Sequence, residues 1–327
     1  MKKITSYFML LFVAVTVLSS FTNKTQTNDN PTEFELLVQY LEENGNFINT
    51  AAPALVLADE IKDNVKNDKY LVLDIRSEGW FDYGHIKNAK NAKGPELLNY
   101  FKNEINPADY EKITIVCYSG QSAAYYASLL RLYGFDNVYS LKWGMSSWAE
   151  ELAQNVWVKN SKNQFDEQLE TTANEMPAAC APPTIKTGKE TAEEILKTRI
   201  EEAFAKPYKE FITKAEAVFE NPADFYVVNY VDEACYNFAH VPGAVKYTPK
   251  ESLASTAHLL TLPTNKKIVV NSETGQEAAY AVAYLHILGY DVANLAYGAN
   301  SFMNQALIDK GWDGFSSEEI KNYTLTE

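Results

Sequence analysis

The chain of 327 residues contains one stretch of sequence twice: Lys112-Ile-Thr-Ile-Val-Cys-Tyr-Ser-Gly-Gln-Ser-Ala-Ala124 recurs without a gap as Lys267-Ile-Val-Val-Asn-Ser-Glu-Thr-Gly-Gln-Glu-Ala-Ala279. Each copy opens with a short apolar run that does not alternate with polar residues, which is typical of a strand buried on both faces of a parallel sheet. A glycine-containing turn and a longer helical pattern follow, over residues 121–133 and 276–288, and each pattern ends at a glycine. Each copy therefore predicts a strand, a loop and a helix.

A second pair of segments lies upstream at the same spacing of 155 residues. Tyr70-Leu-Val-Leu-Asp-Ile-Arg76 corresponds to Phe225-Tyr-Val-Val-Asn-Tyr-Val231, and the histidine that follows, His85, corresponds to His240. Two copies of one domain account for this repeat better than a single large fold. We therefore predict the α/β class, with two tandem domains in which a mostly parallel sheet is flanked by helices.

Capping motifs and composition set the expected domain limits. Thr32-x-x-Glu35 and Thr191-x-x-Glu194 are capping boxes that open a helix ahead of each copy, and a polar, proline-containing stretch separates the copies. The expected order is a signal peptide, a first domain, a linker and a second domain, at residues 1–20, 31–154, 155–189 and 190–327.

The first 20 residues have a basic start at Lys2 and Lys3, an apolar stretch and two small residues, as secretory signals do. We expect an exported protein, periplasmic or secreted. An uncleaved membrane anchor is the alternative, because the apolar stretch approaches the length of a membrane span.

Acidic residues outnumber basic ones by 43 to 29, which gives a formal charge of −14. Such a charge argues against a nucleic-acid partner and repels small anions, so an anion site has to be built locally from backbone amides or a few cations. The three cysteines, Cys117, Cys180 and Cys235, fit no zinc spacing, and the four histidines are scattered. We predict no metal site and no cofactor.

Cys117 ends a predicted strand and opens the loop Tyr118-Ser-Gly-Gln-Ser122 before the helix. In that geometry successive backbone N–H groups and the helix N-terminus stabilise a thiolate, and Gly120 gives the backbone the freedom that a tight turn needs. The alternative is a buried cysteine that acts only as a small apolar side chain.

These segments together resemble the rhodanese family. The matching residues, in chain order, are Leu73-Asp-Ile-Arg76, Phe81, Gly84-His-Ile86, the loop after Cys117, Gly134-Phe-Asp-Asn-Val-Tyr139, Leu141-Lys-Trp-Gly144 and Trp148. The resemblance spans about residues 58–153 and, more weakly, 224–303.

The resemblance implies a sulfurtransferase. Its cysteine thiolate takes the sulfane sulfur of a small anionic donor such as thiosulfate, becomes a persulfide and passes the sulfur to a thiol or a cyanide-like acceptor. Carried onto this sequence, Cys117 is the persulfide carrier, and the anion cradle consists of Tyr118, Ser119, Gly120, Gln121 and Ser122. The matching framework residues are Asp74 and Arg76, expected to pair near the strand end, and His85, expected to fix a turn.

The loop departs from many relatives because no arginine lies in it or directly after it. The related phosphatases and arsenate reductases need a longer loop and an arginine six positions after the cysteine, which clamps a tetrahedral oxyanion. Position 123 is Ala123. Phosphatase activity is therefore not expected, and the preferred sulfur donor stays open.

The second copy has Ser272 where the first has Cys117, with Gly275 in the turn and Glu277 in place of Ser122. A serine hydroxyl does not ionise at neutral pH without a neighbouring base, and a carboxylate at position 277 would repel an anion. We predict a non-catalytic copy that acts as a structural partner, a lid or a binding module.

Two other functions stay open. One is a non-catalytic rhodanese-like binding module, and the other is a thiol–disulfide redox protein that uses Cys117 with Cys180 or Cys235. Cys180 lies in a proline-flanked stretch, where it is incidental, bonds to Cys235, or reaches Cys117 and relays its sulfur.

Overall fold

The computed structural model describes residues 30–327. The predicted signal peptide lies outside the described residues. Within them, no helix is both long and apolar enough to cross a membrane.

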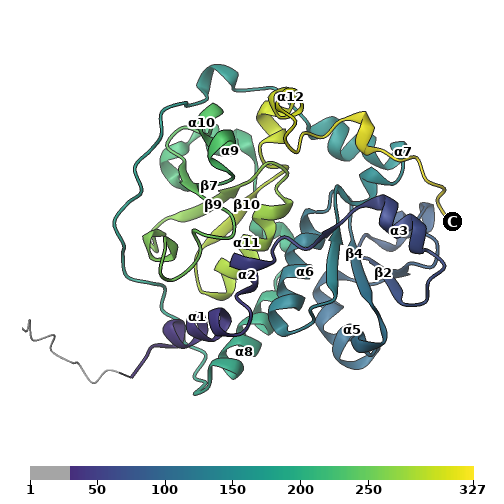
Figure 1. The fold of residues 1–327 in the computed structure, drawn as a ribbon, viewed down its shortest axis with the longest axis horizontal. Coiled ribbons are helices and arrows are strands. Elements are labelled where there is room, and N and C mark those ends of the chain that lie inside the picture. The colour runs from purple at the N-terminus through teal and green to yellow at the C-terminus, as the bar shows by residue number, and fades with distance from the viewer. Residues whose placement is uncertain (1–29) are drawn as a thin grey trace, which may run out of the picture. The chain divides into compact units, whose positions relative to one another are not determined.

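Two five-stranded parallel sheets form the centres of the two domains (Figure 1). The first has the order β1-β5-β4-β2-β3 and the second the order β6-β10-β9-β7-β8, so the two copies share one topology. The strands of the first sheet are β1 (Leu55–Val56), β2 (Tyr70–Asp74), β3 (Lys90–Asn91), β4 (Lys112–Val116) and β5 (Val138–Leu141). Those of the second are β6 (Ile212–Thr213), β7 (Phe225–Tyr230), β8 (Val245–Tyr247), β9 (Lys267–Asn271) and β10 (Val292–Leu295). The predicted α/β class with two tandem domains is confirmed.

Helices flank both sheets. In the first half of the chain they are α1 (Glu33–Glu43), α2 (Phe47–Thr50), α3 (Ala58–Asn64), α4 (Glu78–Tyr83), α5 (Leu97–Asn103), α6 (Gln121–Tyr133) and α7 (Glu150–Ala153). In the second half they are α8 (Ala192–Phe204), α9 (Ala215–Glu220), α10 (Glu233–Phe238), α11 (Gln276–Ile287) and α12 (Asn300–Lys310). The two helices predicted from the repeat, α6 and α11, begin at the predicted residues.

The helices α1 and α8 begin at the two predicted capping motifs. Thr32 and Glu35 form both bonds of a capping box, and the Thr191 side chain accepts the N–H of Glu194. The two helices pack against each other, as Figure 1 shows, although each precedes a different sheet. The lead-in helices therefore join the two domains.

The central contact between the domains is made by α6 and α11 (Figure 1). Small side chains such as Ala127 and Ala283, both fully buried, let the two helices approach closely. The main hydrophobic cluster includes residues of both domains, so the second domain completes the core of the first.

The stretch predicted as a linker lies along the second domain. Glu170 and His240 exchange two backbone hydrogen bonds of 2.9 Å each, and the N–H of Cys180 donates to the Leu260 carbonyl at 2.8 Å. The C-terminal stretch, by contrast, contacts the first domain. Thr326 pairs with His85 of the first domain through two backbone bonds of 2.9 Å.

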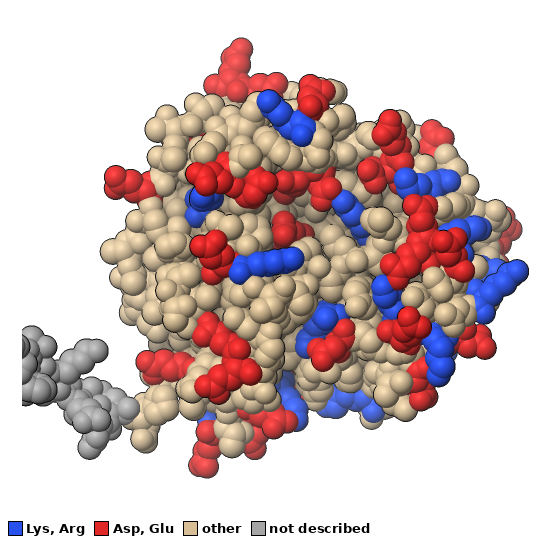
Figure 2. Space-filling model, in the orientation of Figure 1, with Lys and Arg blue, Asp and Glu red and all other residues tan. Residues whose placement is uncertain are grey.

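Acidic side chains are spread over the described surface. On the face drawn in Figure 2, Asp and Glu side chains form several groups with Lys and Arg side chains between them. The acidic excess of the sequence is therefore not confined to one part of this face.

Candidate functional site

Cys117 lies directly after β4, at the point where the loop turns into α6. Its Sγ accepts hydrogen bonds from the backbone N–H of Gly120 at 3.1 Å and of Ala123 at 3.4 Å. Bonds from the Ser122 side chain and the Ser119 amide also act to lower the pKa of the thiol. Three residues of the predicted cradle therefore form hydrogen bonds to the sulfur: Ser119, Gly120 and Ser122.

The Ala123 N–H is a further donor to the sulfur, and it was not predicted from the sequence. It belongs to the first turn of α6, where backbone N–H groups have no partner inside the helix. The predicted helix start at Gln121 could have indicated this donor, because it implies that the N–H of residue 123 has no partner inside the helix.

Burial of Cys117 corrects the expectation that the loop leaves this thiol with a low pKa. The residue is only 2% exposed, and burial raises the pKa of its thiol despite the four hydrogen bonds that lower it. The physical reason is that loss of water around sulfur disfavours the charged thiolate. The donors partly offset this cost.

Two glycines allow the loop to be packed from both sides. Gly120 has φ +87°, and a Cβ there would lie 2.2 Å from Nε2 of Gln276 in the second domain. Gly144 has φ +60°, and a Cβ there would lie 2.5 Å from the Cys117 carbonyl oxygen. Any side chain at either position would displace the loop.

The second domain supplies much of the enclosure around Cys117. Gln276 accepts the N–H of Trp143 at 2.7 Å and donates to the Leu141 carbonyl at 3.1 Å. Burial, and then the nearby Cys117, raise the pKa of Tyr297 to about 12. No motif of the first domain could reveal these neighbours, because the repeat alignment does not say how the domains pack.

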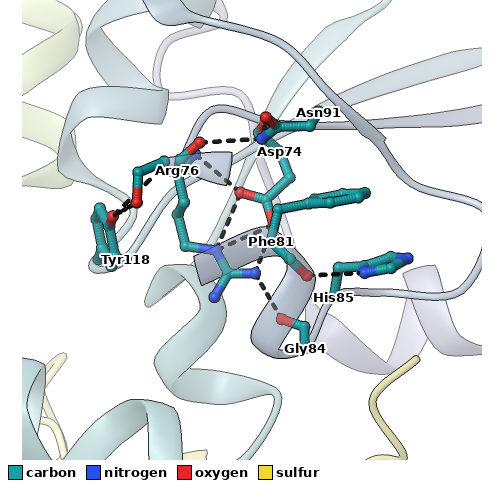
Figure 3. Close-up of polar contacts among 8 residues, drawn as sticks. Asp74, Arg76, Phe81, Gly84, His85, Asn91 and Tyr118 are labelled. Carbon is teal, nitrogen blue, oxygen red and sulfur yellow. Dashed lines mark hydrogen bonds and ion pairs between the residues drawn. The ribbon is translucent and has the colours of Figure 1, made fainter. Parts of the chain in front are cut away.

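The framework residues Asp74 and Arg76 form a buried ion pair at the end of β2 (Figure 3). The Arg76 Nη2 atom lies 2.7 Å from an Asp74 carboxylate oxygen and donates to the Gly84 carbonyl at 2.7 Å. His85 places Nδ1 2.9 Å from the Phe81 carbonyl oxygen and stacks on the Phe81 ring at 3.8 Å. These contacts hold α4 against the sheet.

Tyr118 connects this framework to the cysteine loop. Its hydroxyl accepts the backbone N–H of Ser77 at 3.3 Å. Tyr118 is 36% exposed, so its ring lies at the surface directly beside the buried Cys117. The predicted cradle residue Tyr118 therefore marks the outer edge of the site.

Gln121 points away from the sulfur. Its Oε1 accepts the N–H of Tyr297 at 2.8 Å and the amide of Asn294 at 3.1 Å, both in the second domain. The side chain is occupied by the contact between the domains, so only the backbone N–H of Gln121 could bind an anion as predicted.

The second copy retains the loop geometry with serine in place of cysteine. Ser272 Oγ accepts the N–H groups of Gly275 and Ala278, each at 3.1 Å, as Cys117 does from Gly120 and Ala123. Burial, and then nearby Glu273, raise the pKa of Glu277 to about 7. The backbone geometry of the loop is thus preserved, but the carboxyl group of Glu277 stands in place of the Ser122 hydroxyl.

All three cysteines are free thiols in the described residues. Cys180 Sγ donates to the Leu262 carbonyl at 3.1 Å, so a Cys180–Cys235 bond is not formed and Cys180 contacts a segment other than the Cys117 loop. In residues 30–327 no group of three or more His, Cys, Asp or Glu side chains is placed to hold a metal ion.

A model of the rhodanese-like domain matches this sequence twice, at residues 57–151 and 202–305. A thiosulfate sulfurtransferase, GlpE, of Shewanella oneidensis is 39% identical over 80 residues, which cover 24% of this chain and 75% of that protein. A tRNA uridine(34) hydroxylase of Aster yellows witches'-broom phytoplasma is 26% identical over 126 residues, which cover 37% of this chain and 41% of that protein.

Solved structures include a thiosulfate sulfurtransferase from Pseudomonas aeruginosa, 14% identical, with a TM-score of 0.31 and coverage of 90% of this chain and 48% of that one. A rhodanese-related protein from Thermoplasma volcanium is 28% identical, with a TM-score of 0.27 and coverage of 30% of this chain and 92% of that one.

Proposed function

This chain belongs to the family of rhodanese-like domains, and on that basis we propose that it is a sulfurtransferase whose first domain carries sulfur on Cys117. The observation that carries the proposal is the set of hydrogen-bond donors aimed at Cys117 Sγ, above all the N–H groups of Gly120 and Ala123. Such donors stabilise negative charge on sulfur, both in the attacking thiolate and in the persulfide that follows.

The proposed reaction has two displacement steps. The Cys117 thiolate attacks the sulfane sulfur of thiosulfate, a new S–S bond forms, and the old one breaks as sulfite leaves with the electron pair. Cyanide or an acceptor thiolate then attacks the outer sulfur of the persulfide, and Cys117 leaves as a thiolate. The proton of the resting thiol passes to solvent.

Burial of Cys117 shapes the first step. A raised pKa leaves less thiolate at neutral pH, but a thiolate of higher pKa is intrinsically the stronger nucleophile. Donors that are fixed before reaction also act more strongly in a site that excludes water. We infer that the loop activates the small ionised fraction rather than ionising the thiol fully.

We further propose that the second domain takes no chemical part. Ser272 occupies the equivalent loop of the second domain, and in residues 30–327 its Oγ is hydrogen-bonded to backbone N–H groups and to no basic side chain. The same loop leads into a helix that carries the Glu277 carboxyl group, which opposes an anionic substrate when ionised. Its contribution to the first site is the packing of Gln276 against Gly120.

Export is also a proposal, supported by the basic and apolar character of residues 1–20. Fractionation of cells that produce the full chain tests it. Recovery in the periplasm or medium, with the N-terminus shortened, is expected, and recovery of the full-length chain in the cytoplasm would reject it.

A binding module is the second candidate, and the burial of Cys117 favours it. The two candidates are separated by thiocyanate formation from thiosulfate and cyanide. We expect turnover by the purified protein, its loss in Cys117→Ser, and its retention in the matched control Cys180→Ser. Equal turnover in the Cys117→Ser protein would overturn the sulfurtransferase proposal, and absence of turnover in the wild type would support the binding module.

A further inference from the structure

Three exposed aromatic rings contact one another in sequence, beginning with Tyr118 of the cysteine loop. Trp80, Tyr83 and Tyr118 are 42%, 56% and 36% exposed. The Trp80 ring meets the Tyr83 ring edge to face at a centroid distance of 5.6 Å, and the Tyr118 ring at 6.0 Å. We call these three residues the aromatic rim.

The aromatic rim is held in place from below. The helix α4, which carries Trp80 and Tyr83, buries none of its own residues, yet the buried Arg76 fixes its end through the Gly84 carbonyl (Figure 3). Tyr118 is tied to Ser77 at the start of the same helix. The rings are thus presented to solvent by a supported element rather than by a free loop.

The second domain provides an internal comparison. At the spacing of the repeat, Trp80 corresponds to Cys235, which is 1% exposed, and Tyr118 corresponds to the acidic Glu273. Only Tyr83 has an exposed aromatic counterpart, Phe238, at 39%. The copy without a nucleophile therefore lacks two of the three rings, which associates the complete rim with the chemistry of Cys117.

The shape and charge of the rim favour a particular kind of partner. The three rings are exposed on the surface, whereas small ligands bind mainly in concave sites. Exposed tryptophan and tyrosine on an open surface are typical of protein interfaces. On α4 the carboxylates of Glu78 and Asp82 are exposed, and in residues 30–327 neither forms an ion pair.

We propose that the aromatic rim is a docking surface for a protein sulfur acceptor that presents its cysteine thiol beside lysine or arginine side chains. The free carboxylates of α4 attract such cations, and the faces of the rings bind them. The proposal rests on the sulfurtransferase function above. The acceptor thiolate attacks the outer sulfur of the Cys117 persulfide, the S–S bond breaks, Cys117 leaves as a thiolate, and the acceptor becomes the persulfide.

Sulfur transfer to two matched peptides tests this proposal. The protein is loaded with thiosulfate, freed of donor and checked for the persulfide by intact mass. It is then mixed with a peptide whose single cysteine is flanked by lysines, with the same peptide carrying glutamates, or with cyanide. Each peptide rate is divided by that peptide's rate with a small aromatic disulfide, which removes differences in intrinsic thiol reactivity.

We expect the lysine peptide to react at least about tenfold faster than the glutamate peptide after this correction, with the difference shrinking at high salt. In the double variant Trp80→Ala, Tyr83→Ala the ratio of lysine-peptide rate to cyanide rate should fall about tenfold. The charge reversal Glu78→Lys, Asp82→Lys should make the glutamate peptide the faster one. Phe238→Ala, at the position in the second domain that matches Tyr83, is the control and should keep the wild-type ratio.

Equal corrected rates for the two peptides in the wild type would overturn the docking proposal. An equal fall in the ratio in Phe238→Ala would do the same. If the wild type never gains the persulfide, the sulfurtransferase function fails and the docking proposal with it, whereas loading followed by equal peptide rates rejects the docking proposal alone.

Discussion

The side chains of Gln121 and Gln276 cross in opposite directions between the two domains. Gln121 Oε1 accepts the backbone N–H of Tyr297 at 2.8 Å, and Gln276 Oε1 accepts that of Trp143 at 2.7 Å. Each glutamine begins the helix that follows its own loop, so each loop is braced by the other domain. The second domain is in this way part of the first site without supplying a reacting group.

Removal of this brace should affect both stability and sulfur loading. Gln276→Ala leaves the Trp143 N–H and the Leu141 carbonyl without their partners in a buried place, and we expect the free energy of unfolding to fall by about 1–3 kcal/mol. Persulfide formation should slow as Gly120 loses its support. Urea unfolding and the rate of loading measure the two effects, with the exposed Gln154→Ala as control. Wild-type values for both would show that the brace is unimportant.

Loss of the second-domain hydroxyl should leave catalysis intact. In the described part of the chain Ser272 Oγ is hydrogen-bonded to backbone N–H groups and to no basic side chain. Ser272→Ala should therefore turn over thiosulfate near the wild-type rate, measured as thiocyanate formed. A loss of tenfold or more, about 1.4 kcal/mol of transition-state stabilisation, in a variant that still shows the wild-type circular dichroism spectrum would mean that the second loop takes part.

Glu277 should make stability fall as the pH rises. Its pKa is raised in the folded protein from an ordinary value of 4.5 to about 7, so the folded state holds this proton more tightly than the unfolded state does. That stabilisation is fully present below pH 4.5 and is lost as the pH rises through about 7. Glu277→Gln should therefore be more stable than the wild type at pH 8, by up to about 3 kcal/mol, and equally stable at pH 4.

Urea unfolding at the two pH values measures this difference. The control is Glu318→Gln, which removes an exposed carboxyl group in the C-terminal stretch. A Glu277→Gln variant whose stability relative to the wild type does not change with pH would contradict the raised pKa.

The three thiols should differ sharply towards alkylation. Cys180 is exposed, whereas Cys117 and Cys235 are buried, so iodoacetamide should modify Cys180 first in the native protein. Burial raises the pKa of Cys117, and its slower alkylation should therefore keep increasing above pH 8.5, where an ordinary cysteine begins to level off. Peptide mapping after timed quenching gives the three rates. A Cys117 rate that is already constant between pH 6 and 8 would show a low pKa instead.

The repeat carried most of the information about the fold. Unbroken apolar runs and the glycines after them located β4, β9, α6 and α11, because a buried parallel strand and a helix end have strong local signals. The sequence also located Cys117 and its loop. What it could not supply was the packing of one domain on the other, since contacts such as Gln276 with Gly120 join residues far apart in the chain.

Because the packing of the domains was unknown, the raised pKa of the Cys117 thiol was not predicted from the sequence. From the loop alone, amides and a helix start predict a low pKa for Cys117. The enclosure of the loop by the second domain removes water, and burial then outweighs the hydrogen bonds. Trp80 and Tyr83 were likewise not singled out, because only the structure shows that their rings are exposed next to the loop.

Intact mass spectrometry after incubation with thiosulfate shows whether Cys117 carries sulfur. We expect the purified protein to gain the mass of one sulfur atom, peptide mapping to place it on Cys117, and cyanide to remove it. No gain in mass, or the same gain in the Cys117→Ser variant, would contradict the assignment of Cys117 as the sulfur carrier.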